Sequence, residues 1–143
     1  MYKRILVAIE NSDADGTILK HVRDLARLTG GELLLVHVAD GWAARHFDDL
    51  QLRESEEMRD DREYLARLEV TLRGEGFSVR TLLAKGDPAT ELVRVASSES
   101  SDLIAMATHG HRFLADVVKG TTVDRLRHLV KIPVLLVRAQ ERA

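Results

Sequence analysis

The chain has 143 residues, the length of one ordinary domain, and we predict a single domain over residues 1–143. Hydrophobic residues make up 45% of the sequence and charged residues 31%, a balance that is typical of a globular fold and excludes a disordered chain. The absence of cysteine excludes disulfides and thiolate chemistry, and the formal net charge of −2 gives no global field that would attract nucleic acid or anionic lipid.

Five short apolar runs predict five β-strands. The first, RILVAI at 4–9, is almost continuously apolar, as expected for a strand buried on both faces of a parallel sheet. It is too short for a signal-peptide core or a membrane span, and acidic residues follow it, so we expect a cytoplasmic protein. The predicted strands are 4–9, 32–38, 77–83, 102–106 and 133–137, and the third alternates like a strand near a sheet edge.

Helical patterns separate these strands. Apolar residues fall on one stripe within 17–28, and Gly30 and Gly31 are expected to end that helix. A long helix follows the second strand, and we interpret its charged side as a solvated face. Asp87 is expected to cap the next helix, and Thr121 to open the last one.

The resulting order, βαβαβαβαβ, predicts an α/β fold: an open five-stranded parallel sheet with helices on both faces. Ligands of such sheets bind outside the carboxyl ends of the strands, where the strand order reverses. The segments AIENSD, at the end of the first strand, and MATHG, at the end of the fourth, are the candidates for that crevice.

The stretch MATHGHRFLADVVKGTT at 106–122 places Gly110 and Gly120 ten residues apart, and Thr121 and Thr122 follow directly. Glycines let a phosphate approach the backbone, and the amide groups that open a helix carry partial positive charge. The same residues fit a plain turn, a close passage of two segments and a helix cap equally well. Both interpretations stay open on spacing alone, and neither a P-loop signature nor GxGxxG occurs to decide between them.

The chain resembles the universal stress proteins, in particular the small, single-domain, UspA-like kind. The match runs from YKRILVAIENSDAD through LLLVHV and GDPATELVRVASSESSDLIAMATHG to KGTTVDRLRHLVKIPVLLV, which is nearly the whole length. Its most specific part is the family's nucleotide-binding pattern G-x2-G-x9-G-[S/T], which corresponds here to Ala107, Gly110, Gly120 and Thr121. The resemblance implies a Rossmann-like sheet of the adenine nucleotide alpha hydrolase-like type with an ATP site.

The resemblance also implies where ATP would lie, with Mg²⁺ carried by its phosphates. The implied cofactor-binding residues are Ala8, Ile9 and Val38 for the adenine, Glu10 and the backbone near Met106 for the ribose, and Gly110, Gly120, Thr121 and Thr122 for the phosphates, with Ala107 where the backbone passes close to the nucleotide. Two of these positions depart from the family pattern. Ala107 adds a methyl group where the family has glycine, and Glu10 has a longer arm than the usual aspartate.

We predict a nucleotide-dependent stress-response or signalling module, with at most slow ATP hydrolysis because no dedicated water-activating residue stands out. The alternative is a nucleotide-independent, dimeric interaction module of the same fold. A phosphoacceptor receiver domain is disfavoured: it needs paired acids after the first strand and an aspartate ending the third, where this chain has Glu10 before NSD and then LLAKG. His109 and His111 lack a third ligand at suitable spacing, so no metal site is expected.

The last predicted strand is apolar, and at a sheet edge it would expose unpaired backbone groups. This pattern suggests pairing with a second copy, and the resemblance implies a homodimer through Pro133 to Val137. A C-terminal tail or a helix that covers the edge is the alternative. Nucleic acid and membranes are not expected as partners.

Overall fold

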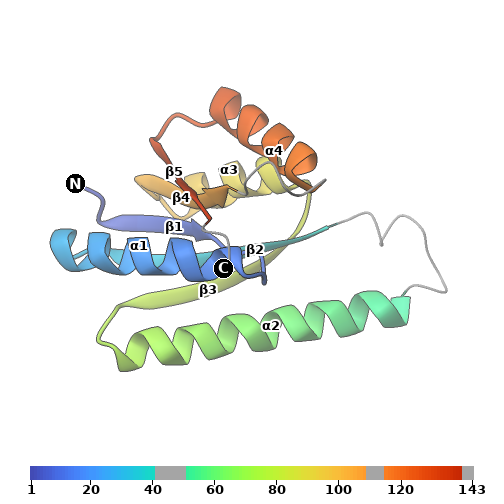
Figure 1. Cartoon of the computed structure of the whole chain (residues 1–143), viewed down its shortest axis with the longest axis horizontal. Coiled ribbons are helices and arrows are strands. Elements are labelled where there is room, and N and C mark those ends of the chain that lie inside the picture. Colours follow the sequence, from blue (N-terminus) through green and yellow to red (C-terminus); the bar gives the residue numbers. More distant parts are fainter. Residues whose placement is uncertain (41–50, 109–114, 140–143) are drawn as a thin grey trace.

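The computed structural model describes residues 1–40, 51–108 and 115–139. Within them, five parallel strands form one sheet in the order β3-β2-β1-β4-β5, with helices on both faces (Figure 1). The strands are β1 (Arg4–Ala8), β2 (Glu32–Asp40), β3 (Val79–Gly86), β4 (Leu103–Thr108) and β5 (Val134–Arg138); the helices are α1 (Ala14–Thr29), α2 (Gln51–Gly74), α3 (Pro88–Ser98) and α4 (Ala115–Leu129). The predicted α/β sheet is confirmed.

Alternation along the strands divides the core into two layers. Ile5 and Val7 of β1 pack with buried residues of α1 and α2, whereas Leu6 between them packs with α3 and α4. All three side chains are fully buried, and each such burial contributes about 1.5–3 kcal/mol. We call the two sides the α1/α2 face and the α3/α4 face.

Two helix boundaries follow the predicted local chemistry. α1 is followed by Gly30, whose φ of 71° is left-handed and whose amide donates to the Ala26 carbonyl at 2.8 Å. α3 starts directly after Asp87, with Pro88 as its first residue, where the missing amide hydrogen removes no helical bond. The sequence therefore determines these ends locally.

α4 differs from the prediction at its start. The sequence predicts that Thr121 opens the last helix, whereas α4 begins at Ala115 and contains Gly120. That prediction was wrong because it treated Gly120 as a boundary, although one interior glycine costs a helix only about 1 kcal/mol relative to alanine. The amide groups from Gly120 to Thr122 consequently lie within the helix, beyond the four amino-terminal amides that have no intrahelical partner.

β1 occupies the centre of the sheet, with β2 on one side and β4 on the other. The chain winds outward from β1 through β2 to β3, then crosses over to β4 and β5, so the strand order reverses between β1 and β4. The switch point thus falls at the ends of the first and fourth strands, as predicted. Among the helices of the described residues, none combines the length and the apolar character needed to cross a membrane.

Candidate functional site

Three of the predicted site residues lie on one side of the sheet, at the carboxyl ends of β1, β2 and β4. Ala8, Val38 and Met106 all belong to the core layer of the α3/α4 face. Ala8 and Val38 are half-buried, and Met106 is 7% exposed. The switch point therefore presents a small, apolar set of side chains beneath α3 and α4, a lining that suits a flat apolar group such as a nucleobase.

Ile9 and Ala107 point the other way. Both belong to the core layer of the α1/α2 face, at 3% and 6% exposure. Ile9 still takes part in the sheet, because its amide donates to the Val36 carbonyl at 2.8 Å. The structure thus does not bring these two side chains together with Ala8, Val38 and Met106, and only their backbones lie at the junction.

The position of Ala107 leads to a prediction. Its methyl group fills space in the α1/α2 layer, so Ala107→Gly removes buried apolar volume and adds a glycine to a strand. We expect the free energy of unfolding, measured in urea, to fall by about 1–2 kcal/mol. A glycine variant as stable as the parent would show that the Ala107 methyl group contributes nothing to this layer.

Glu10 follows β1, and its backbone is held by a buried carboxylate. Asp15, which is 2% exposed, accepts hydrogen bonds from the amides of Glu10 (2.9 Å), Asn11 (2.8 Å) and Ser12 (3.2 Å). Asn11 adopts a left-handed φ of 61°, which lets successive amides converge on one anion. The Ser12 hydroxyl donates to Glu10 Oε2 at 3.0 Å, so the side chain is oriented as well.

Helix α2 reaches this loop from the other side. The Tyr64 hydroxyl donates to Asp15 Oδ2 at 2.7 Å, and Asn11 Nδ2 donates to Asp61 Oδ1 at 3.1 Å. Burial raises the pKa of Tyr64 far above its ordinary value, since the phenolate would lose its hydration, and the hydrogen bond to Asp15 adds to the rise. Tyr64 is consequently a donor at every physiological pH.

His37 has a polar neighbour at each ring nitrogen, which fits the sequence-based interpretation of a core group rather than a base. Nδ1 lies 2.7 Å from the Ile9 carbonyl, which can only accept, so Nδ1 carries the hydrogen. Nε2 lies 3.1 Å from Asp61 Oδ2, where a protonated ring forms an ion pair. This arrangement ties the ends of β1 and β2 to α2.

Sequence reasoning missed Asp15, Asp61 and Tyr64. The acids stood among many others on amphipathic helices, where charge usually means solvent. A usable signal for Asp15 was its place in the first helical turn, four residues after the asparagine at 11, since Asn readily adopts the left-handed conformation. Nothing in the sequence relates Asp15 to a tyrosine 49 positions away.

The predicted phosphate-binding residues are only partly described. Gly110 lies outside the described residues, and Gly120 and Thr121 lie within α4. Thr122 is half-buried, and its neighbour Val123 packs on the α3/α4 face. From Val123 onward, α4 thus lies on the side of the sheet where Ala8 and Met106 lie.

A polar group marks the carboxyl end of β3. Asp87 accepts from the amide and the hydroxyl of Thr90, at 3.0 and 2.7 Å, and pairs with Arg125 of α4 at 2.6 Å. These contacts hold the pKa of Asp87 below its ordinary value, chiefly through the Thr90 hydroxyl and amide and then through Arg125. The pair connects the amino end of α3 to α4.

Asp87→Ala tests this cap. Removing it should lower the free energy of unfolding at pH 7 by about 1 kcal/mol. Because the pKa of Asp87 is lowered in the folded protein, the carboxylate stabilises the fold at pH values above its unfolded pKa of 3.8. This stabilisation is lost as the pH falls through the folded pKa. Urea titrations should therefore show the difference between the two proteins shrinking below about pH 4; a pH-independent difference would contradict it.

Metal ligands were not predicted, and within the described ranges no group of three or more His, Asp and Glu side chains is placed to hold a metal ion. His109 and His111 lie outside these ranges. For the described part of the site, the acids at the junction of β1 and β2 are engaged with amides, a tyrosine and a histidine.

Comparison with known proteins fits this architecture. A model of the universal stress protein family matches residues 1–138. The universal stress protein MJ0577 of Methanocaldococcus jannaschii is 26% identical over 96% of each chain, and its structure matches with a TM-score of 0.86 over 99% of both. A universal stress protein in complex with cAMP is similar in fold (TM-score 0.73, 16% identity, 97% of this chain and 98% of that one). A universal stress protein from Archaeoglobus fulgidus in complex with dAMP is also similar in fold (TM-score 0.70, 21% identity, 95% of this chain and 98% of that one).

The family model covers all five strands and all four helices, from the first residue to the end of β5. The MJ0577 structure matches over almost the full length of both chains, so the similarity is not confined to a shared sheet motif. The chain belongs to the universal stress protein family.

Proposed function

We propose that this protein binds ATP at the carboxyl edge of its sheet and acts as a nucleotide-dependent stress-response or signalling module, as one cytoplasmic domain. The observation that carries the proposal is the convergence of Ala8, Val38 and Met106 at the switch point, directly beside Glu10. Family members crystallised with dAMP and with cAMP support an adenine nucleotide as the class of ligand.

The residues at this edge fit an adenine nucleoside. The half-buried Ala8 and Val38 offer apolar surface for the base, with Ile9 contributing backbone. A carboxylate at the end of the first strand suits ribose hydroxyls, which donate hydrogen bonds, and Glu10 supplies one. The backbone near Met106 and Ala107 completes this part of the proposed site.

The triphosphate is proposed to lie on Gly110, Gly120, Thr121 and Thr122, with Mg²⁺ bound through the phosphate oxygens. Because α4 already includes Gly120, its amide becomes available to a phosphate only if the turn that starts at Ala115 unwinds. Gly120 has the weakest helix propensity of residues 115–120, which favours a break there. We therefore propose that phosphate binding moves the start of α4 to Thr121.

We propose a regulatory role for bound ATP, with at most slow hydrolysis. Rapid phosphoryl transfer needs a group that orients or deprotonates the attacking water. Among the described residues at the carboxyl edge, Asp15 is committed to three amides, Asp61 to Asn11 and His37, and Asp87 to Thr90 and Arg125. These contacts leave the three carboxylates in structural roles, and Glu10 is assigned to the ribose hydroxyls.

The second proposed partner is another copy of the chain. β5 is at the edge of the sheet. The Ile104 amide donates to the Pro133 carbonyl, and the Ala139 amide donates to the Thr108 carbonyl. The backbone groups of the odd-numbered residues of this strand therefore point toward β4. The amide and carbonyl groups of the even-numbered residues, with Leu136 at the centre, point away from β4 toward the open edge of the sheet. Antiparallel pairing of two β5 strands across a two-fold axis would join the two sheets.

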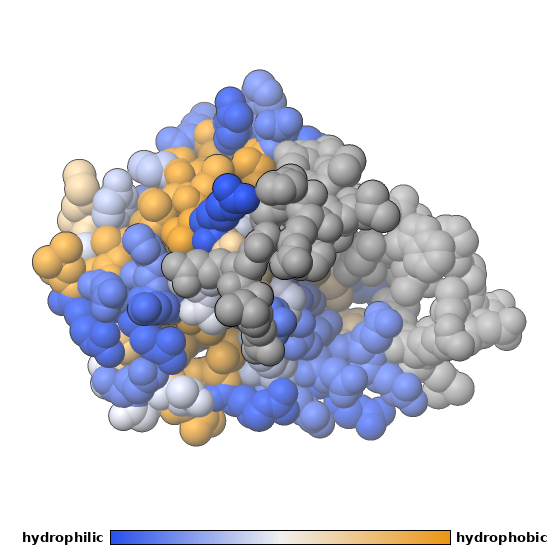
Figure 2. Space-filling model, viewed as in Figure 1, coloured by the Kyte–Doolittle hydropathy of each residue, from blue (hydrophilic) through white to orange (hydrophobic). Residues whose placement is uncertain are grey.

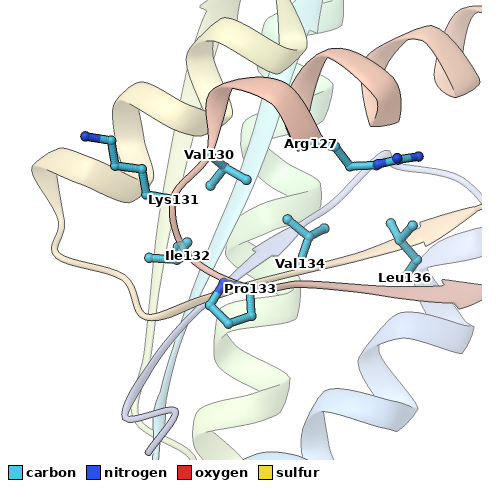
Figure 3. Close-up of a pocket in the computed structure, with 7 residues that line it drawn as sticks. All are labelled: Arg127, Val130, Lys131, Ile132, Pro133, Val134 and Leu136. Carbon is cyan, nitrogen blue, oxygen red and sulfur yellow. The ribbon is translucent and has the colours of Figure 1, made fainter.

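The surface beside this edge supports the same partner. A shallow groove of about 550 Å³ runs between the end of α4 and β5 and is lined by Arg127, Val130, Lys131, Ile132, Pro133, Val134 and Leu136 (Figure 3). Val134 and Leu136 project into it from the same side of β5 (Figure 3). Figure 2 shows a hydrophobic patch at the upper left, over the region where Figure 1 draws β5 and the end of α4. Leu136 is 41% exposed.

Isothermal titration of nucleotide-stripped protein with Mg-ATP tests the nucleotide proposal. We expect micromolar binding, and we expect Gly120→Val to weaken it by roughly tenfold or more, because a β-branched side chain would occupy the path of the phosphates. The matched control is Gly16→Val, which places the same side chain on a glycine in the first turn of α1, where nothing lies within 4 Å of the added Cβ. The control should bind ATP like the parent protein.

The outcomes separate the two candidate functions. Binding that is lost in Gly120→Val and kept in Gly16→Val supports the phosphate site. Absence of binding up to millimolar ATP would overturn it and favour the nucleotide-independent, dimeric interaction module, for which the exposed β5 edge is the specific observation.

A further inference from the structure

Helix α2 makes a set of polar contacts that its packing in the core does not require. Leu65 and Leu72 already anchor it to the α1/α2 layer, at 3% and 0% exposure. Asp61 and Tyr64, one turn apart, add hydrogen bonds to the loop after β1 and to the end of β2. We call these two residues and their partners Asn11, Asp15 and His37 the α2 clamp.

The α2 clamp acts on the backbone of Glu10 from both of its sides. Asp15 holds the Glu10 amide, and Tyr64 fixes the Asp15 carboxylate through the oxygen that also accepts from Asn11 and Ser12. On the other side of Glu10, the Ile9 carbonyl is bound to His37, which Asp61 holds in turn. Glu10 therefore stands between two backbone groups that both depend on α2.

The geometry of these contacts is tight for a loop that faces solvent. The hydrogen bonds of Tyr64 and His37 are both 2.7 Å, and the side chains of His37 and Asp61 are 14% and 16% exposed. The Tyr64 bond is charge-assisted because its acceptor is the Asp15 carboxylate, and such bonds are about twice as strong as neutral ones. The loop is thus held to α2 through Asn11 and Asp15, and to β2 through His37.

We propose that Asp61 and Tyr64 are positioning residues for the nucleotide site, acting through Glu10. This rests on the proposed ATP binding. In the docked position of α2, the clamp holds Glu10 where it meets the sugar hydroxyls, so a displacement of α2 releases Glu10 and weakens that contact. By reciprocity, a bound ribonucleotide holds α2 in place, so the exposed acidic side of α2, which includes Glu56, Glu57, Asp60 and Glu63, reports whether the site is filled.

Tyr64→Phe tests this with the least disturbance, because it removes one hydroxyl and keeps the ring. Titrations with Mg-ATP and with 2′,3′-dideoxy-ATP, which lacks both sugar hydroxyls, separate the sugar contact from the rest. We expect Tyr64→Phe to weaken ATP about threefold to tenfold and to leave the dideoxy compound within twofold of the parent. Asp61→Asn should act alike, while Asp60→Asn, the same charge change on the exposed side of α2, should leave both affinities unchanged.

Hydrogen exchange without nucleotide gives an independent readout. The amides of Glu10, Asn11 and Ser12 should exchange at least about tenfold faster in Tyr64→Phe than in the parent, because their shared acceptor is no longer fixed. Adding Mg-ATP to the parent should slow exchange in α2 around Asp61 and Tyr64. In Tyr64→Phe this slowing should be lost.

Each of the following results would overturn the proposal. Equal weakening of ATP and dideoxy-ATP would mean a general loss of structure, and unchanged exchange at the Glu10, Asn11 and Ser12 amides would mean that α2 does not hold the loop. A parent protein that binds no ATP would overturn the proposed function together with this one. If the parent binds ATP but Tyr64→Phe does not weaken ATP more than dideoxy-ATP, the positioning role alone is overturned.

Discussion

Asp15→Ala should be among the most destabilising single substitutions in this protein, lowering the free energy of unfolding by about 3–4 kcal/mol at pH 7. The carboxylate is 2% exposed and receives four hydrogen bonds, from the amides of Glu10, Asn11 and Ser12 and from the Tyr64 hydroxyl. Alanine supplies no acceptor, so these donors lose their partner at once. Removing a charged acceptor costs more than removing a neutral one because each bond is charge-assisted.

Chemical denaturation in urea measures this effect, and two further variants identify its origin. Asp15→Asn keeps one carbonyl oxygen but turns an amide group toward donors, so it should cost about 1–2 kcal/mol. Asp24→Ala, on the exposed surface of the same helix, removes a carboxylate that is 78% exposed and should change stability by less than about 0.5 kcal/mol. An Asp15→Ala protein as stable as Asp24→Ala would show that water replaces the buried carboxylate without loss.

The fold follows from the sequence because its signals are local. RILVAI, ELLLVHV and PVLLV are apolar runs of strand length, and helical stripes separate the strands, so the strand count, the parallel sheet and its two helical layers could all be predicted. The start of α4 could not. A glycine inside a helix costs about 1 kcal/mol relative to alanine, and the sequence does not say whether the turns on either side of Gly120 compensate for that loss.

The candidate site was predictable in position but not in the direction of its side chains. The rule of carboxyl ends pointed to the segments AIENSD and MATHG, which contain Ala8, Glu10 and Met106, and the family resemblance added Val38. Whether Ala107 faces the α1/α2 layer depends on a register of strand pairing that a run of small apolar residues does not fix. The α2 clamp was beyond prediction, since it joins groups up to 50 residues apart in sequence through single hydrogen bonds.

The proposed dimer makes a prediction of comparable size, for the edge strand β5. Leu136→Asp should raise the dissociation constant of the homodimer by roughly a hundredfold, because a two-fold axis through β5 brings the two introduced carboxylates close together, and like charges at an interface cost several kcal/mol. Leu136 is 41% exposed in the single chain, so the substitution should leave the monomer folded. Size-exclusion chromatography with light scattering over a concentration series measures the change.

Leu136→Pro separates backbone pairing from apolar contact at the same position. The Leu136 amide points away from β4, so proline should leave the β4–β5 ladder intact and yet remove a hydrogen bond from the centre of the proposed interface. Arg127→Ala, at the rim of the groove, should leave the dimer within about threefold of the parent. If the edges pair, both Leu136 variants are monomers at concentrations where the Arg127 variant is a dimer. A dimer that survives Leu136→Pro and fails in Leu136→Asp would instead be held by the apolar groove, with the β5 edges apart.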